Sequence, residues 1–279
     1  MSREKILWYV LLVIAVVFVP PYLIDRLHPG LIFPVREKVV TSASVVEDLS
    51  PGLSAVEKFN RLFQAGKEAA KVNKRNDAIA NFEAAEQFAP QLIEKKDESL
   101  RDVRQWLASQ YEVTQQYPEM EAVYSRMLDS LRETSSDYDI NLGSDYSWLS
   151  MIRAREGNWP GAEESSRQAI DAFDKTIRHF DGLADPQNNV QSARFNKAFA
   201  LFRLANAYNQ EGKMDFAVYT ADQSYRYGTE VNVGDGVLKL FATLGLQIAT
   251  KANDREAIAL WGQRLDKLAA ISAGTPPGF

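Results

Sequence analysis

The chain has 279 residues, of which 46% are hydrophobic, and it carries a formal net charge of −5 at pH 7. An acidic chain whose basic residues are scattered gives no reason to expect nucleic acid as a partner. The absence of cysteine excludes disulfides, thiolate catalysis and thiolate-ligated metal sites.

An uncharged apolar run occupies residues 6–24. At about 1.5 Å per residue, a helix of this length spans the hydrocarbon core of a bilayer. The run therefore predicts an N-terminal transmembrane helix, with residues 1–25 as a membrane anchor. A cleaved signal peptide is the alternative, but no Ala-x-Ala-type cleavage site follows the run. Aromatic and proline residues mark the two ends of the predicted span, namely Trp8, Tyr9, Pro20, Pro21 and Tyr22.

Basic residues flank this run on both sides, so charge asymmetry barely decides its orientation. A span near the start of a chain, followed by a large domain, is typical of an uncleaved signal anchor. The expected localisation is a single-pass membrane protein with a cytoplasmic N-terminus and the remaining domain on the outer, periplasmic side. The lipid bilayer is then a predicted partner.

Three further segments follow the predicted anchor. Residues 26–53 are expected to form a linker, residues 54–273 a helical domain and residues 274–279 a flexible tail. Ser54 and Glu57 have the spacing of a capping box, which predicts the first helix of the domain.

Residues 59–90 have the pattern of two antiparallel helices joined by a short turn. Small residues, including Gly66 and Ala78, allow the two helices to approach closely, and Phe82 fills the space between them. Pro90 lacks an N–H group and is expected to end the second helix.

The same spacing of twelve positions recurs four times, although Met120 takes the place of a small residue in the second copy, which is weaker than the first. The pairs are Gly66 and Ala78, Ala108 and Met120, Ser150 and Ala162, Ala205 and Ala217, and Gly245 and Ala257. The position of Phe82 is taken in later copies by Tyr124, Ser166, Ala221 and Trp261. Ser166 fits the pattern poorly, as does Arg264 three residues after Trp261.

This pattern of small, aromatic and proline residues resembles the tetratricopeptide repeat, abbreviated TPR. The resemblance implies an all-α solenoid of about five helical hairpins. The copies lie 42, 42, 55 and 40 residues apart, against 34 in the ordinary repeat, so longer helices or loops are expected. An irregular stretch at 181–191 is expected to account for the interval of 55. The first helix of each hairpin is predicted near residues 59–72, 101–114, 143–156, 198–211 and 238–251.

The resemblance also implies that these first helices line a concave groove that binds other proteins. Helical spacing around each small residue projects a set of partner-binding side chains into that groove. They are Lys67, Gln105, Met151, Phe202, Asn206, Asn209 and Gln210.

No catalytic motif, cofactor site or metal site is predicted. Neither His28 nor His179 has a second histidine within a helical turn, and the chain contains no phosphate-binding loop. The leading hypothesis is therefore a non-enzymatic, membrane-anchored scaffold for protein–protein interaction. The alternative is a permanent accessory subunit of a large membrane complex, of the energy-transducing or translocation kind.

Overall fold

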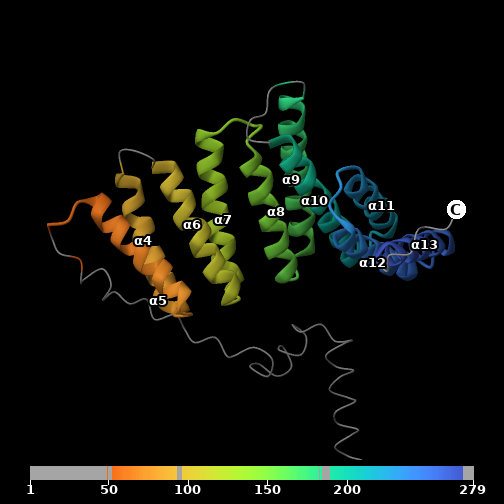
Figure 1. Cartoon of the computed structure of the whole chain (residues 1–279), viewed down its shortest axis with the longest axis horizontal. Coiled ribbons are helices and arrows are strands. Elements are labelled where there is room, and N and C mark those ends of the chain that lie inside the picture. Colours follow the sequence, from red (N-terminus) through yellow and green to blue (C-terminus); the bar gives the residue numbers. More distant parts are fainter. Residues whose placement is uncertain (1–48, 50–51, 93–95, 182, 184–188, 273–279) are drawn as a thin grey trace, which may run out of the picture. The chain divides into compact units, whose positions relative to one another are not determined.

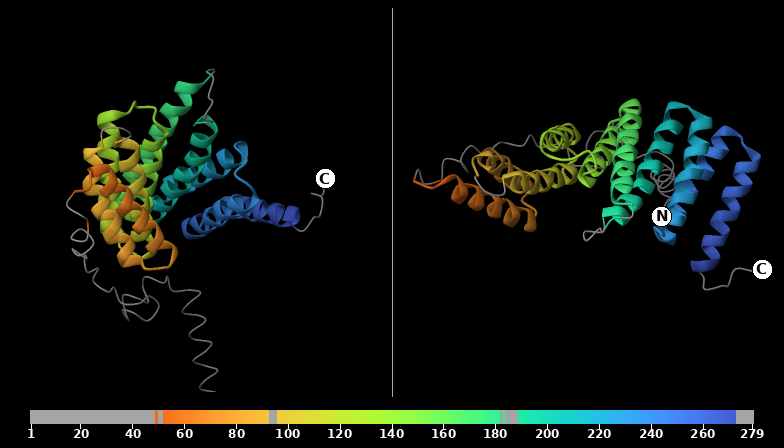
Figure 2. Two further views of the ribbon diagram at one scale, coloured as in Figure 1. Left: turned by 60° about the vertical axis from the view of Figure 1, so that its left-hand side comes forward. Right: turned by 90° about the horizontal axis from the view of Figure 1, so that it is seen from above.

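The computed structural model describes residues 49, 52–92, 96–181, 183 and 189–272. Within this part of the chain there are ten α-helices, a short 3₁₀ helix and no strand. The helices follow one another as five hairpins in chain order (Figures 1 and 2). The predicted all-helical repeat architecture is thus confirmed for the described residues.

Each of the five hairpins consists of two helices that follow one another in the chain. They are α4 (Ala55–Lys71) with α5 (Arg75–Phe88), α6 (Lys96–Val113) with α7 (Tyr117–Thr134), α8 (Ile140–Arg155) with α9 (Trp159–Phe180), α10 (Asn189–Glu211) with α11 (Met214–Glu230), and α12 (Asp235–Ala252) with α13 (Arg255–Ser272). The 3₁₀ helix η1 (Ala89–Gln91) follows α5. The first helices overlap all five predicted ranges.

Local sequence explains where the first hairpin begins and ends. The Ser54 hydroxyl accepts a hydrogen bond from the Glu57 N–H at 3.3 Å, and the Glu57 carboxylate accepts one from the Ser54 N–H at 2.9 Å. This reciprocal pair is the predicted capping box. At the other end, α5 stops at Phe88, and Pro90 lies in the 3₁₀ turn that follows.

Each hairpin turns through one residue in the left-handed backbone region. These residues are Asn73, Gln115, Gly157, Gly212 and Asn253, with φ between 55° and 77°. Asparagine and glycine occupy four of the five positions because they adopt positive φ most readily. In the fifth hairpin the turn residue lies eight positions after Gly245, whereas it lies seven after the matching small residue elsewhere.

Glycine packs against a large aromatic ring inside three hairpins. A Cβ added at Gly66 would lie 2.6 Å from the Phe82 ring, and one at Gly245 would overlap the Trp261 ring. Both pairs were predicted from spacing. In the third hairpin the equivalent contact is Gly143 on Phe173; Gly143 lies seven positions before the expected Ser150, and Phe173 lies seven positions after the expected Ser166.

Helices pack mainly on their neighbours in the chain, with additional contacts between first helices. Helix α10 contacts both α8 and α12, which are the first helices of the hairpins before and after it. The long interval of 55 residues between Ser150 and Ala205 has two causes. Helices α9 and α10 are the longest, with 22 and 23 residues, and residues 181–188 separate them. Longer helices, and not only the irregular stretch, therefore produce the wide spacing.

One prediction needs correction. None of the helices in the described ranges is long and apolar enough to cross a membrane, which contradicts the predicted single-pass localisation. Each buries one face on its neighbours and carries charges elsewhere; even the apolar α12 contains Asp235, Lys239 and Lys251. The predicted span at 6–24, with Trp8, Tyr9, Pro20, Pro21 and Tyr22, lies outside the described residues, and so do most of the linker and the tail at 274–279.

Candidate functional site

Polar side chains connect the first helices of successive hairpins. The Arg101 guanidinium of α6 donates two hydrogen bonds of 3.0 Å to the Asp145 carboxylate of α8. The Arg203 guanidinium of α10 donates to the Ser147 hydroxyl of α8. The Lys251 ammonium of α12 donates to the backbone carbonyl of Asn209 on α10 at 2.7 Å. First helices from four hairpins are therefore joined through side chains.

Asp145 is the most deeply buried charged group among these links. Its side chain is 2% exposed, whereas that of Arg101 is 20% exposed. Burial raises the pKa of the Asp145 carboxyl to about 6, and the bidentate pair with Arg101 only partly opposes that rise. This link joins the second and third hairpins and depends on the charge of one buried carboxylate.

Arg203 differs from Arg101 because its partner is neutral. Arg203 as a residue is half-buried, its guanidinium donates to the Ser147 hydroxyl, and no carboxylate in the described part of the chain pairs with it. Burial lowers the pKa of Arg203, which is the expected effect of desolvating a cation. A positive charge that no carboxylate of the described residues compensates therefore lies between α8 and α10.

Two further predicted residues lie one helical turn along from this contact. Met151 follows Ser147 by one turn on α8, and Asn206 follows Arg203 by one turn on α10. Both are half-buried. Since α8 and α10 run in the same direction, the two residues extend the Ser147–Arg203 contact along both helices. We call this set, Ser147, Met151, Phe202, Arg203 and Asn206, the α8–α10 surface.

Phe202 precedes Arg203 in α10 and packs against the next hairpin. Its ring stacks on Phe241 of α12, with ring centroids 5.0 Å apart, and the residue remains half-buried. Lys67 behaves in a comparable way in the first hairpin, where its ammonium lies 4.0 Å from the Phe63 ring centroid and 5.7 Å from that of Trp106. Lys67 is therefore held on rings instead of being extended into solvent.

The remaining predicted residues divide into exposed and buried. Gln105 and Gln210 are exposed. Asn209, expected in the groove, is only 8% exposed, and its side-chain oxygen is buried without a hydrogen-bond partner among the described residues. Asn209 lies on the side of α10 that faces α12, where the Lys251 ammonium contacts its backbone carbonyl. The neighbouring hairpin therefore covers Asn209. Helical spacing gives the direction of a residue but not how closely the next hairpin covers it.

Sequence reasoning missed Arg203 and Asp145 as site residues. Arg203 is the only charged residue in the stretch 198–207, which is otherwise apolar apart from Asn206. A lone arginine in such a stretch is a signal that the helix buries a charge. Asp145 has other polar residues near it in the sequence, including Asn141, Ser144 and Ser147, so the sequence did not indicate that it is buried.

The arrangement offers contacts for a polypeptide. Among the residues that the structure describes, no three histidine, aspartate or glutamate side chains are grouped to hold a metal ion. The α8–α10 surface instead combines a cation, an amide and two apolar side chains. These groups can bind the side chains and backbone of an extended segment of another protein.

Comparison with known proteins identifies the fold. No protein-family model matches the sequence, and no significant match is found among curated proteins. Solved structures of TPR-like repeats do match. A kinesin light chain-like protein of Podosopora anserina, with nearly identical TPR-like repeats, aligns with a TM-score of 0.55 at 12% identity, covering 77% of this chain and 96% of that one. BtubC (BKLC) from P. vanneervenii aligns with a TM-score of 0.56 at 14% identity, covering 81% and 95%.

Proposed function

We propose that this chain, whose fold is that of TPR-like repeats, is a non-enzymatic scaffold that binds a segment of another protein on the α8–α10 surface. The repeat fold supports a role in protein–protein interaction, since stacked hairpins present a long surface for partners. The segment contributes a carboxylate, from an acidic side chain or a chain terminus, to Arg203.

The observation that carries this proposal is the half-buried Arg203, whose guanidinium has only the neutral Ser147 hydroxyl as a partner among the described residues. Holding a desolvated cation without an anion is unfavourable, so a bound carboxylate would be stabilised. A guanidinium also matches a carboxylate geometrically, because it donates parallel hydrogen bonds to both oxygens. Met151 and Phe202 would pack on apolar side chains of the segment, and Asn206 would bond its backbone.

The experiment places a photo-crosslinking amino acid at Asn206 in the full-length protein, in cells that produce it. Gln87 on α5 is exposed and lies on a second helix, so it is the matched control position. We expect a partner to crosslink at position 206 and not at position 87. The crosslink should be lost when Arg203→Ala is added, whereas Arg178→Ala, which removes an exposed arginine from α9, should leave it intact.

The same preparation distinguishes a transient scaffold from a permanent subunit. A partner recovered in stoichiometric amount after a salt wash would identify this chain as a built-in subunit of a complex. Recovery of the chain alone, together with the crosslink in cells, would identify a scaffold with exchangeable partners. Equal crosslinking at positions 206 and 87, or a crosslink unaffected by Arg203→Ala, would overturn the proposal.

A further inference from the structure

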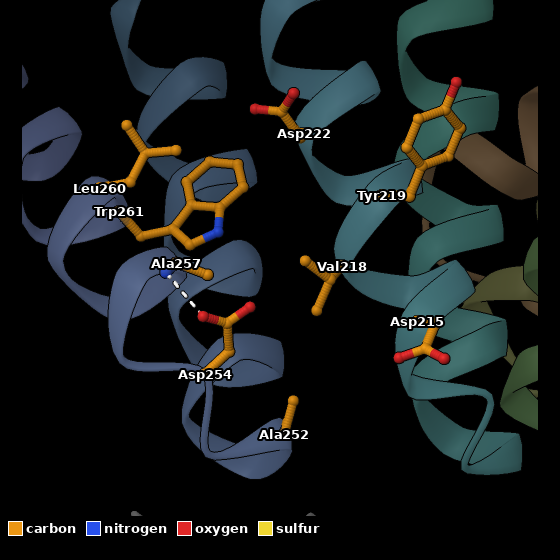
Figure 3. A pocket seen from close by; sticks show the side chains of 9 residues that line it. All are labelled: Asp215, Val218, Tyr219, Asp222, Ala252, Asp254, Ala257, Leu260 and Trp261. Atoms are coloured by element: carbon orange, nitrogen blue, oxygen red, sulfur yellow. Dashed lines mark hydrogen bonds between the residues drawn. The ribbon is translucent and has the colours of Figure 1, made fainter.

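A second concave site lies on the second helices of the last two hairpins, away from the α8–α10 surface. It is an open pocket of about 510 Å³ between α11 and α13 (Figure 3). Val218, Ala257 and Trp261 form its apolar lining. The pocket is large enough to receive one long side chain of another molecule.

Three carboxylates surround this apolar lining, as Figure 3 shows: Asp215 and Asp222 on α11, and Asp254 at the start of α13. Asp222 is compensated by Arg264, whose Nη2 lies 2.7 Å from its Oδ1. Asp254 accepts a hydrogen bond from the Ala257 N–H at 3.0 Å but has no cationic partner in the described residues. Asp215 likewise forms no ion pair within the described residues and is exposed. Two negative charges therefore face the pocket without a counter-ion from the described chain.

Large apolar side chains at the rim are also uncovered. Tyr219 is 64% exposed and Leu260 is 43% exposed, and both line the pocket from opposite helices. An exposed ring and an exposed leucine beside a pocket are typical of a surface that another protein covers.

We propose that the α11–α13 pocket binds an arginine or lysine side chain, flanked by apolar residues, from a partner protein. Charge complementarity decides the occupant: Asp215 and Asp254 attract a cation, and Tyr219 offers a ring face to the same group. The flanking apolar residues pack on Leu260 and on the ring of Tyr219. This site prefers the charge opposite to that preferred by Arg203, so it serves a different segment.

The test uses two synthetic peptides, Ac-Gly-Leu-Arg-Leu-Gly-NH₂ and the same peptide with the uncharged citrulline in place of arginine. Each is titrated into the isotope-labelled full-length protein while amide NMR shifts are followed. We expect the arginine peptide to shift amides in 215–222 and 254–261, and the citrulline peptide to bind at least fivefold more weakly. Comparable binding of both peptides, or shifts confined to other helices, would overturn the proposal.

Substitutions separate this site from its surroundings. Asp215→Asn combined with Asp254→Asn preserves side-chain shape, and asparagine retains the ability to cap α13. This variant should weaken binding of the arginine peptide at least fivefold. Asp266→Asn, which removes an exposed carboxylate elsewhere on α13, should leave binding unchanged. Arg203→Ala should also leave it unchanged, so failure here is distinct from failure of the proposed function. If the double variant and the unsubstituted protein bind the arginine peptide equally well, the α11–α13 pocket is not its binding site.

Discussion

The hydroxyl oxygens of Ser150 and Ser166 lie 2.6 Å apart in the interior of the α8–α9 hairpin. Both residues are at most 1% exposed. They occupy the positions at which the first hairpin has Gly66 and Phe82. A hydrogen bond thus replaces a small-residue-on-aromatic contact in the third hairpin, and the glycine–aromatic pair moves to Gly143 and Phe173.

This pairing predicts strong coupling between the two serines. Ser150→Ala or Ser166→Ala alone should each lower the free energy of unfolding by about 1 kcal/mol, because the remaining hydroxyl loses its buried partner. The double variant should cost clearly less than the sum of the two. Urea denaturation of all four proteins gives the interaction energy. Strict additivity would show that the hydroxyls do not depend on one another.

Two glycines of the last hairpin should respond oppositely to the same substitution. Gly245→Ala places a methyl group against the Trp261 ring, and the resulting overpacking should cost about 1–3 kcal/mol. Gly262→Ala, in the interior of α13, meets no atom within 4 Å and should stabilise the protein by about 0.5–1 kcal/mol through helix propensity. Thermal or urea unfolding measures both. The packing explanation fails if Gly245→Ala is as well tolerated as Gly262→Ala.

The turn between α10 and α11 should depend on backbone conformation alone. Gly212 has φ +76° and open space around its missing Cβ. Gly212→Ala should therefore destabilise the protein by about 1 kcal/mol through strain, without any clash. Gly236→Ala is the matched control, since Gly236 also has open space but no positive φ. If both variants unfold at the same urea concentration, strain at position 212 is not the reason.

Asp145 should make stability depend on pH in the direction opposite to most paired carboxylates. Its folded-state pKa, about 6, lies above its ordinary value of 3.8. The folded state therefore binds this proton more tightly than the unfolded chain does. The resulting stabilisation is fully present below about pH 4 and is lost as the pH rises toward 6.

Asp145→Asn isolates this effect, because asparagine has the same shape and does not titrate. The excess unfolding free energy of the unsubstituted protein over this variant should fall by about 2 kcal/mol between pH 4.5 and pH 7. Urea titrations of both proteins across that range measure it. An excess that rises with pH would mean that the pair with Arg101 outweighs burial of the carboxylate.

The local features of the fold were determined by the sequence itself. The capping box of Ser54 and Glu57, the stop at Pro90 and the contact of Gly66 with Phe82 depend on residues within about one hairpin of each other. Propensity, capping and small–large pairing act over that range, so a single sequence was enough to place five hairpins. The membrane localisation was inferred from the apolar run at residues 6–24, its flanking aromatic residues and its place before a large domain, and it is contradicted by the helices described.

The candidate site required the tertiary structure. Arg101 reaches Asp145 across 44 residues, and Arg203 reaches Ser147 across 56. Such contacts depend on how each hairpin is rotated against the next, and helical periodicity does not specify that rotation. The same rotation buries Asn209, which spacing had placed in the groove, and leaves Arg203 beside a hydroxyl and not a carboxylate. Sequence thus determined which helices form, whereas packing between hairpins decided which of their side chains remain available to a partner.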